Sequence, residues 1–152
     1  MPDVTFRDAT LADLPAIVTL LAEDTLGERR EDPSLPLDPA YECAFITIAA
    51  NPDQRQIVAE RDGVAVGTMQ LTFIPGIAFR GAWRGQIEAV RVAGALRGQG
   101  IGAQMIDWGV EQCRARGCRM VQLTSDKSRT AAHRFYERLG WVRSHEGFKI
   151  KL

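Results

Sequence analysis

The stretch "ALRGQGIGAQMI", residues 95–106, places three glycines and an arginine at the start of a predicted helix. A glycine inside a helix costs on the order of 1 kcal/mol relative to alanine, so its repeated use here needs a backbone reason. Without Cβ atoms, the peptide N–H groups of residues 98–103 face outward and let a ligand approach closely. The first turn of a helix has unpaired N–H groups and the positive end of the helix dipole, which together suit phosphate. With Arg97 beside it, this segment is predicted to bind a pyrophosphate group.

The spacing of the glycines excludes two other phosphate motifs. A Walker loop needs Lys-Ser or Lys-Thr after its last glycine, whereas Ala-Gln follows Gly102. Glycines at alternate positions give GxGxG, which is not the GxGxxG of dinucleotide-binding folds. What remains is Arg97-x-x-Gly100-x-Gly102, directly after a predicted strand and directly before an amphipathic helix.

Length and charge narrow the class of protein. A chain of 152 residues predicts a single domain over residues 1–152, with 45% hydrophobic and 25% charged residues. The 19 basic and 19 acidic side chains cancel, which argues against nucleic acid or an anionic membrane as a partner. No apolar run approaches the roughly 20 residues that span a bilayer, and the start lacks the pattern of a signal peptide. We therefore expect a cytoplasmic protein.

The three cysteines, Cys43, Cys113 and Cys118, show neither CxxC nor Cys/His spacing. This pattern argues against a disulfide framework and against a zinc site, so no metal is expected. Reduced and buried thiols are the favoured interpretation.

The rest of the chain predicts a mixed α/β fold. The predicted strands are residues 4–10, two arms of a hairpin in 55–75 around Asp62-Gly63, residues 86–92 and 118–125, and two last strands in 141–152 around Glu146-Gly147. Helices are predicted after the N-cap Thr10, with Asp13 three residues on, over residues 40–51, after the glycine segment, and over 128–140 up to Gly140. The strand, helix and strand after residue 86 form a βαβ unit, which implies parallel pairing.

Two segments carry further structural expectations. The helix after the glycine segment has a stripe at helical spacing, in which two glycines let the helix lie close to a sheet. The members of this stripe are Gly102, Met105, Ile106, Gly109, Val110 and Cys113. Residues 23–39 are rich in charge, proline and glycine, and are equally well interpreted as a solvated loop or as a lid that faces a substrate.

The pattern Arg97-x-x-Gly100-x-Gly102 resembles the R/Q-x-x-G-x-G/A signature of the GNAT superfamily of N-acetyltransferases, which bind acetyl-coenzyme A. The stretch "HRFYERLGW", residues 133–141, resembles the second signature of that family. The order of elements over about residues 3–150 is similar as well. Two positions depart from the family pattern: Gly94 stands where many members have proline, and Arg129 where asparagine is frequent.

The resemblance implies a fold in which one strand, two helices, three strands, a helix, a strand, a helix and two strands follow one another. The fourth and fifth strands are parallel and splay apart at a bulge, and the pantetheine arm of the coenzyme lies in the gap and pairs with the main chain near Val90 and Val92. The residues implied to bind the coenzyme are Val90, Arg91, Val92, Arg97, Gly98, Gln99, Gly100, Ile101, Gly102, Ala103, Arg129 and His133.

Acetyl transfer to an amine needs a base and is helped by an acid. A free alkyl ammonium has a pKa near 10 and must lose a proton before it attacks the thioester, and the leaving thiolate departs more easily when protonated. By resemblance, Glu88 is the base, acting through water, and Tyr136 donates a proton to the sulfur. The alternatives are that Glu88 is an exposed carboxylate or pairs with Arg91 or Arg84, and that Tyr136 is a core aromatic. His133 is favoured as a surface or coenzyme-edge residue.

The function implied is an acetyl-coenzyme A-dependent N-acetyltransferase that acts on a primary amine of a small molecule or peptide by direct attack in a ternary complex. A covalent acetyl-cysteine route is disfavoured. The alternatives are a non-catalytic acyl-coenzyme A sensor on the same fold and, more weakly, a nucleotide-binding domain. The resemblance to the family also implies a homodimer.

The sequence does not decide whether the amine acceptor is acidic or basic. Trp83, Arg80 and Arg84 would suit an acidic acceptor, whereas Glu28, Glu31 and Asp32 would suit a basic one. Both groups are equally well interpreted as surface loops.

Overall fold

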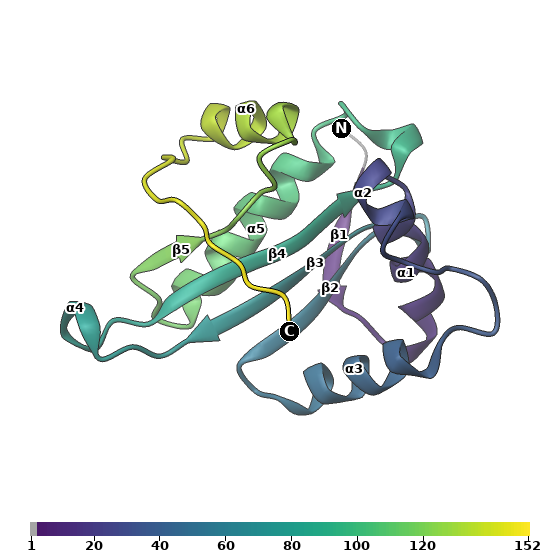
Figure 1. Cartoon of the computed structure of the whole chain (residues 1–152), viewed down its shortest axis with the longest axis horizontal. Helices are drawn as coiled ribbons and strands as arrows, with labels where there is room; N and C mark the ends of the chain where they lie inside the picture. Colours follow the sequence, from purple (N-terminus) through teal and green to yellow (C-terminus); the bar gives the residue numbers. More distant parts are fainter. Residues whose placement is uncertain (1–2) are drawn as a thin grey trace. The chain divides into compact units, whose positions relative to one another are not determined.

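The computed structural model describes residues 3–152, which form two compact units (Figure 1). The first unit runs to Gln122 and contains a five-stranded sheet in the order β1-β2-β3-β4-β5. The strands are β1 (Thr5–Asp8), β2 (Gln54–Arg61), β3 (Val64–Ile74), β4 (Arg84–Val92) and β5 (Met120–Gln122). The first three pairings are antiparallel and β4 pairs with β5 in parallel, which confirms the predicted mixed sheet.

The helices of the first unit connect these strands and cover the sheet. They are η1 (Leu11–Asp13), α1 (Leu14–Ala22), α2 (Thr25–Glu28), α3 (Pro39–Ala50), α4 (Ala78–Gly81), η2 (Gly94–Leu96) and α5 (Ile101–Ala115). α1 packs against β3 and α3 against β2, whereas α5 packs against β3 and β4 (Figure 1). The short helices α2 and α4 were not predicted, because a single helical turn has no periodicity for a sequence to display.

Two local predictions about turns and caps are confirmed. Asp62 and Gly63 have φ of 53° and 76°, so both residues of the β2–β3 turn are left-handed, as a two-residue hairpin loop favours. At the start of η1, the carboxylate of Asp13 accepts a hydrogen bond of 2.7 Å from the amide of Thr10. The guanidinium of Arg7 also donates to this carboxylate and lowers the pKa of Asp13 to about 2.

One part of the core of the first unit forms where α5 lies on the sheet, and another forms around Leu14, Val18 and Phe45 of α1 and α3. Met105, Ile106, Gly109 and Cys113 are buried, as the predicted stripe requires, whereas Val110 is half-buried. A Cβ atom on Gly109 would lie 3.2 Å from Met69 Cε and 3.3 Å from Ile87 Cδ1. A side chain at Gly109 would therefore press against the sheet, so the glycine allows α5 to lie close to β3 and β4.

The second unit, Leu123–Leu152, contains α6 (Thr130–Arg138). Gly140 follows the helix with φ of 87°, as predicted for a helix-ending glycine. The two strands predicted in residues 141–152 are wrong, because the structure assigns no strand there. Phe148, Ile150 and Leu152 alternate with lysines but are exposed, so the segment has the pattern of a strand and no neighbour that pairs with it.

The expectation of a single domain over residues 1–152 stays a prediction. No helix within residues 3–152 is both long enough and apolar enough to cross a membrane.

The contact between α5 and the N-terminal half of β4 gives the first testable prediction. An alanine methyl group at Gly85 would overlap the sulfur of Cys113 and lie 2.9 Å from its Cβ. Overpacking of this kind costs about 1–3 kcal/mol, so Gly85→Ala should lower the free energy of unfolding by that amount. Gly147→Ala is the control, since nothing in the part of the chain that the structure describes lies within 4 Å of its Cβ position. Equal midpoints of urea unfolding for the two variants would contradict this packing.

Candidate active site

A β-bulge interrupts β4 in the middle of the sheet. Gln70 of β3 pairs with Glu88, but Thr68 pairs with Arg91, so two residues of β4 lie opposite the single residue Met69. Ala89, one of the two, has a φ of 51°, which a residue with a side chain rarely adopts. An extra residue of this kind bends the strand and re-aims its side chains, and bulges are frequent beside active sites.

The parallel pairing of β4 with β5 ends before the bulge. It covers three pairs, Arg84 with Met120, Gly85 with Val121 and Gln86 with Gln122. Beyond Gln86, the edge of β4 that faces away from β3 has no partner strand in the part of the chain that the structure describes. This open edge leaves main-chain donors and acceptors for a ligand with amide groups.

The glycine segment follows the open edge and leads into α5. Gly98 and Gly100 have φ of 78° and 84°, and no atom of the described residues 3–152 lies within 4 Å of either Cβ position. Within residues 3–152, the amides of residues 98–103 have no hydrogen-bond partner, and the first helical bond runs from the Gln104 amide to the Gly100 carbonyl at 3.1 Å. These six donors stand at the start of a helix of 15 residues, where the helix dipole also favours an anion.

Arg97 is turned back toward the protein. Its Nε donates to the carbonyl of Val92 at 3.2 Å, and its Nη2 lies 3.5 Å from the carboxylate of Glu23. Glu23 also accepts a hydrogen bond of 2.7 Å from the amide of Gly94. The carboxylate thus joins the end of α1 to the loop between β4 and the glycine segment.

Arg91 makes a second link between the same two regions. Its Nε lies 3.2 Å from Asp24, with only 13% and 21% of the two side chains exposed, and its Nη1 donates to the Val90 carbonyl at 2.9 Å. Asp24 also caps α2 by accepting from the Gly27 amide at 2.6 Å. Glu23 and Asp24 were missed in the sequence, because their partners lie about 70 residues away and only the fold brings them together.

Glu88 lies on the exposed face of β4, one residue before the bulge. It shares that face with Gln86, whereas Ile87 points the other way and is buried beneath α5, as strand alternation predicts. Among residues 3–152, no hydrogen bond or ion pair involves the Glu88 carboxylate, so the expected alternative of a pair with Arg91 or Arg84 is not formed.

The two thiols near α5 are poor nucleophiles. Burial raises the pKa of Cys113 to about 11, and burial also raises the pKa of Cys118. A thiol attacks as the thiolate, so neither supports a covalent route at neutral pH. Cys43 is exposed on α3.

The other candidate residues belong to the second unit. Tyr136 is half-buried on α6, with its ring 5.1 Å from Phe135 and 6.1 Å from Trp141. His133 Nε2 lies 2.8 Å from the carbonyl of Asp126, and Arg129 is the N-cap residue of α6. Glu88, Val90–Val92 and the segment 97–103 are therefore brought together on one unit, and Arg129, His133 and Tyr136 on the other.

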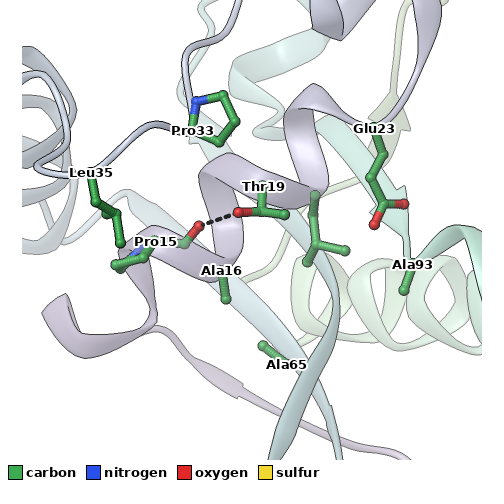
Figure 2. A pocket seen from close by; sticks show the side chains of 9 residues that line it. Pro15, Ala16, Thr19, Glu23, Pro33, Leu35, Ala65 and Ala93 are labelled. Atoms are coloured by element: carbon green, nitrogen blue, oxygen red, sulfur yellow. Dashed lines mark hydrogen bonds between the residues drawn. The ribbon is translucent and has the colours of Figure 1, made fainter.

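A hollow of about 300 Å³ lies beside α1, next to the residue that follows β4 (Figure 2). Its lining residues are Pro15, Ala16, Thr19, Leu20, Glu23, Pro33, Leu35, Ala65 and Ala93. Pro33 and Leu35 come from the segment 23–39, whose role the sequence left open. In residues 3–152, no group of three or more His, Cys, Asp or Glu side chains is placed to hold a metal ion.

Known proteins match this fold over nearly its whole length. The model of the acetyltransferase (GNAT) family matches residues 14–141. Aminoalkylphosphonate N-acetyltransferase of Salmonella typhimurium is 31% identical over 97% of this chain and 91% of its own. The crystal structure of a transcriptional regulator from Bacillus halodurans has a TM-score of 0.96 at 45% identity, covering 99% of this chain and 100% of that one. A putative acetyltransferase from Agrobacterium tumefaciens has a TM-score of 0.85 at 28% identity, covering 97% and 99%.

The chain belongs to the acetyltransferase (GNAT) family. The resemblance seen in the sequence is confirmed, as are the fold class and the prediction of an acyltransferase.

The ion pair between Asp24 and Arg91 gives a second prediction. Asp24→Asn keeps an oxygen for the Gly27 amide but leaves the largely buried Arg91 without its charge partner. Breaking such a pair should lower the free energy of unfolding by about 2–3 kcal/mol. Asp62→Asn is the matched control, because Asp62 is 92% exposed and lies 3.8 Å from Arg61. Urea unfolding measures both, and a loss no larger than that of the control would show that Arg91 does not depend on Asp24.

Proposed function

We propose that the protein is an acetyl-coenzyme A-dependent N-acetyltransferase that acts on a primary amine by direct attack in a ternary complex. The observation that carries this proposal is the continuity of the bulge, the open edge of β4 and the unpaired amides of residues 98–103. The strand edge suits the amides of a pantetheine arm, and the helix start suits a diphosphate. The two groups follow one another along coenzyme A in the same order as these two parts of the site follow one another along the protein.

The residues of the first unit offer the coenzyme matching groups. The amides of Gly98, Gln99, Gly100, Ile101, Gly102 and Ala103 would hold the diphosphate, with Arg97 adding charge once it leaves Glu23. Val90, Arg91 and Val92 would present their main chain to the pantetheine arm, and we assign Arg129 and His133 to its outer part. The bound coenzyme supplies the acetyl group as a thioester.

Glu88 and Tyr136 are assigned the two proton transfers. Glu88 is exposed and has no competing partner among residues 3–152, so its carboxylate is available to take a proton from the ammonium through water. A phenol holds its proton at neutral pH, so the hydroxyl of Tyr136 has one to give to the departing sulfur. With two separate groups, no single residue has to serve both as the base and as the acid.

We propose small amines that carry a phosphonate as the first acceptors to examine. The relative named for aminoalkylphosphonate acetylation aligns with nearly the whole of both chains, which supports a similar acceptor here.

The decisive experiment is a screen of the purified chain with acetyl-coenzyme A. Aminomethylphosphonate, polyamines, aminoglycosides and short peptides serve as acceptors, and release of free thiol and the mass of the product report transfer. Transfer to at least one amine is expected. Binding of coenzyme A by calorimetry without transfer to any amine would instead support a sensor, a role favoured by the name of the Bacillus halodurans relative, a transcriptional regulator. Absence of binding would refute both.

The role of Tyr136 gives a third prediction for the same assay. Tyr136→Phe should lower kcat by at least about tenfold, because it removes only the hydroxyl proton donor, and should leave the KM for acetyl-coenzyme A nearly unchanged. Tyr41→Phe is the control, since it removes the hydroxyl of the other tyrosine, which donates to Glu31 on the first unit. An unchanged kcat in Tyr136→Phe would remove the acid role.

A further inference from the structure

Three arginines lie in or beside one hollow near the start of β4 and β5. A hollow of about 360 Å³ there is lined by Phe79, Arg80, Ala82, Arg119 and Met120. Arg84 stands beside Met120 in the parallel pairing, and the amide of Arg119 donates to the carbonyl of Trp83 at 2.9 Å. The hollow lies in the first unit.

These arginines have no anionic partner within residues 3–152. No hydrogen bond or ion pair involves the guanidinium groups of Arg80, Arg84 or Arg119, whereas Arg55 and Arg91 each pair with an aspartate. The Nε of Arg84 is buried and has no hydrogen-bond partner. A buried donor on a charged group is costly when unsatisfied, and an anion that accepts from it removes that cost.

The backbone that carries Arg80 is held in an unfavourable conformation. Phe79, Arg80 and Gly81 have φ of 54°, 59° and 74°, so three consecutive residues are left-handed. Only glycine adopts this region without strain, and strained residues of this kind gather at ligand clamps. This strained turn carries Arg80, one of the residues that line the hollow.

The chemistry of the lining points to a compact anion on a short alkyl chain. Two arginines are among the residues that line the hollow, no acidic residue is, and the other lining residues are apolar. The planar donor fork of arginine matches the oxygen atoms of a phosphonate or phosphate group.

Arg84, which pairs with the lining residue Met120, lies on the same strand as Glu88. Arg84 and Glu88 lie on the same face of β4, four residues and thus about 13 Å apart along the strand. Both side chains are long, so they cover much of that separation. A small acceptor whose anionic group is bound by Arg84 would have its amine toward Glu88.

We propose that Arg80, Arg84 and Arg119 form a subsite that binds the phosphonate or phosphate group of the amine acceptor. This proposal rests on the proposed function for its link to catalysis, but the binding of the anion is independent of turnover. It favours an acidic acceptor over a basic one, the choice that the sequence left open.

The test compares acceptors with and without the anionic group. For the wild-type chain, kcat/KM should be at least tenfold higher with aminomethylphosphonate than with ethylamine. Arg84→Gln and Arg119→Gln should lower this preference at least tenfold, whereas Arg114→Gln, an exposed arginine paired with Glu111 on α5, should keep it within twofold. Glycine as a third acceptor separates recognition of a phosphonate from recognition of any acid.

Direct binding separates failure of the subsite from failure of the proposed function. Methylphosphonate, titrated against tryptophan fluorescence in the whole chain, should saturate in wild type and lose at least tenfold in affinity in both arginine variants. If no amine is acetylated but this loss is seen, the proposed function fails and the anion site stands. If amines are acetylated with an unchanged preference and unchanged methylphosphonate binding in both variants, the subsite is refuted. Should Arg84→Gln not fold, the same two measurements on Arg119→Gln decide whether the subsite exists.

Discussion

The single extra residue that β4 carries opposite Met69 is the constraint on which the site depends. Before it, β4 is tied to β3 on one side and β5 on the other, and Gly85 and Ile87 lie beneath α5. After it, the strand keeps only β3 as a neighbour and leads through Gly94 to the unpaired amides of α5. The bulge therefore divides β4 into a half that is built into the core and a half whose edge is open to a ligand.

Much of this arrangement was predictable from local sequence patterns. The turn at Asp62-Gly63, the buried stripe of α5 and the free amides after Arg97 each follow from the conformational preferences of a few neighbouring residues. Local patterns also led to the wrong prediction of two strands in residues 141–152. Alternation shows that a segment has an apolar face, but a strand exists only where another strand satisfies its main chain.

The parts that were not predictable depend on residues far apart in the chain. Glu23 and Asp24 have the sequence pattern of the start of a charged loop, yet they accept from Gly94 and pair with Arg91 and Arg97 across the end of β4. As a result Arg97, expected to project its charge toward a diphosphate, is partly neutralised by Glu23. A phosphate that binds at the amides of α5 competes with this carboxylate for Arg97, so the affinity for the ligand includes the cost of that exchange.

The arginines of the first unit differ in whether a carboxylate pairs with them. In the first unit, Arg7, Arg55, Arg91 and Arg116 each pair with an aspartate. Against that background Arg80, Arg84 and Arg119 lie in or beside one hollow with no carboxylate in its lining, and a strained turn holds one of them there. Arg80 and Arg119 are exposed, but the buried Nε of Arg84 has no hydrogen-bond partner within residues 3–152, and folding alone gains nothing from such a donor. An anion from outside the chain would satisfy this donor, and under the two proposals β4 carries the acceptor subsite at its start and the coenzyme site at its end, with the bulge between them.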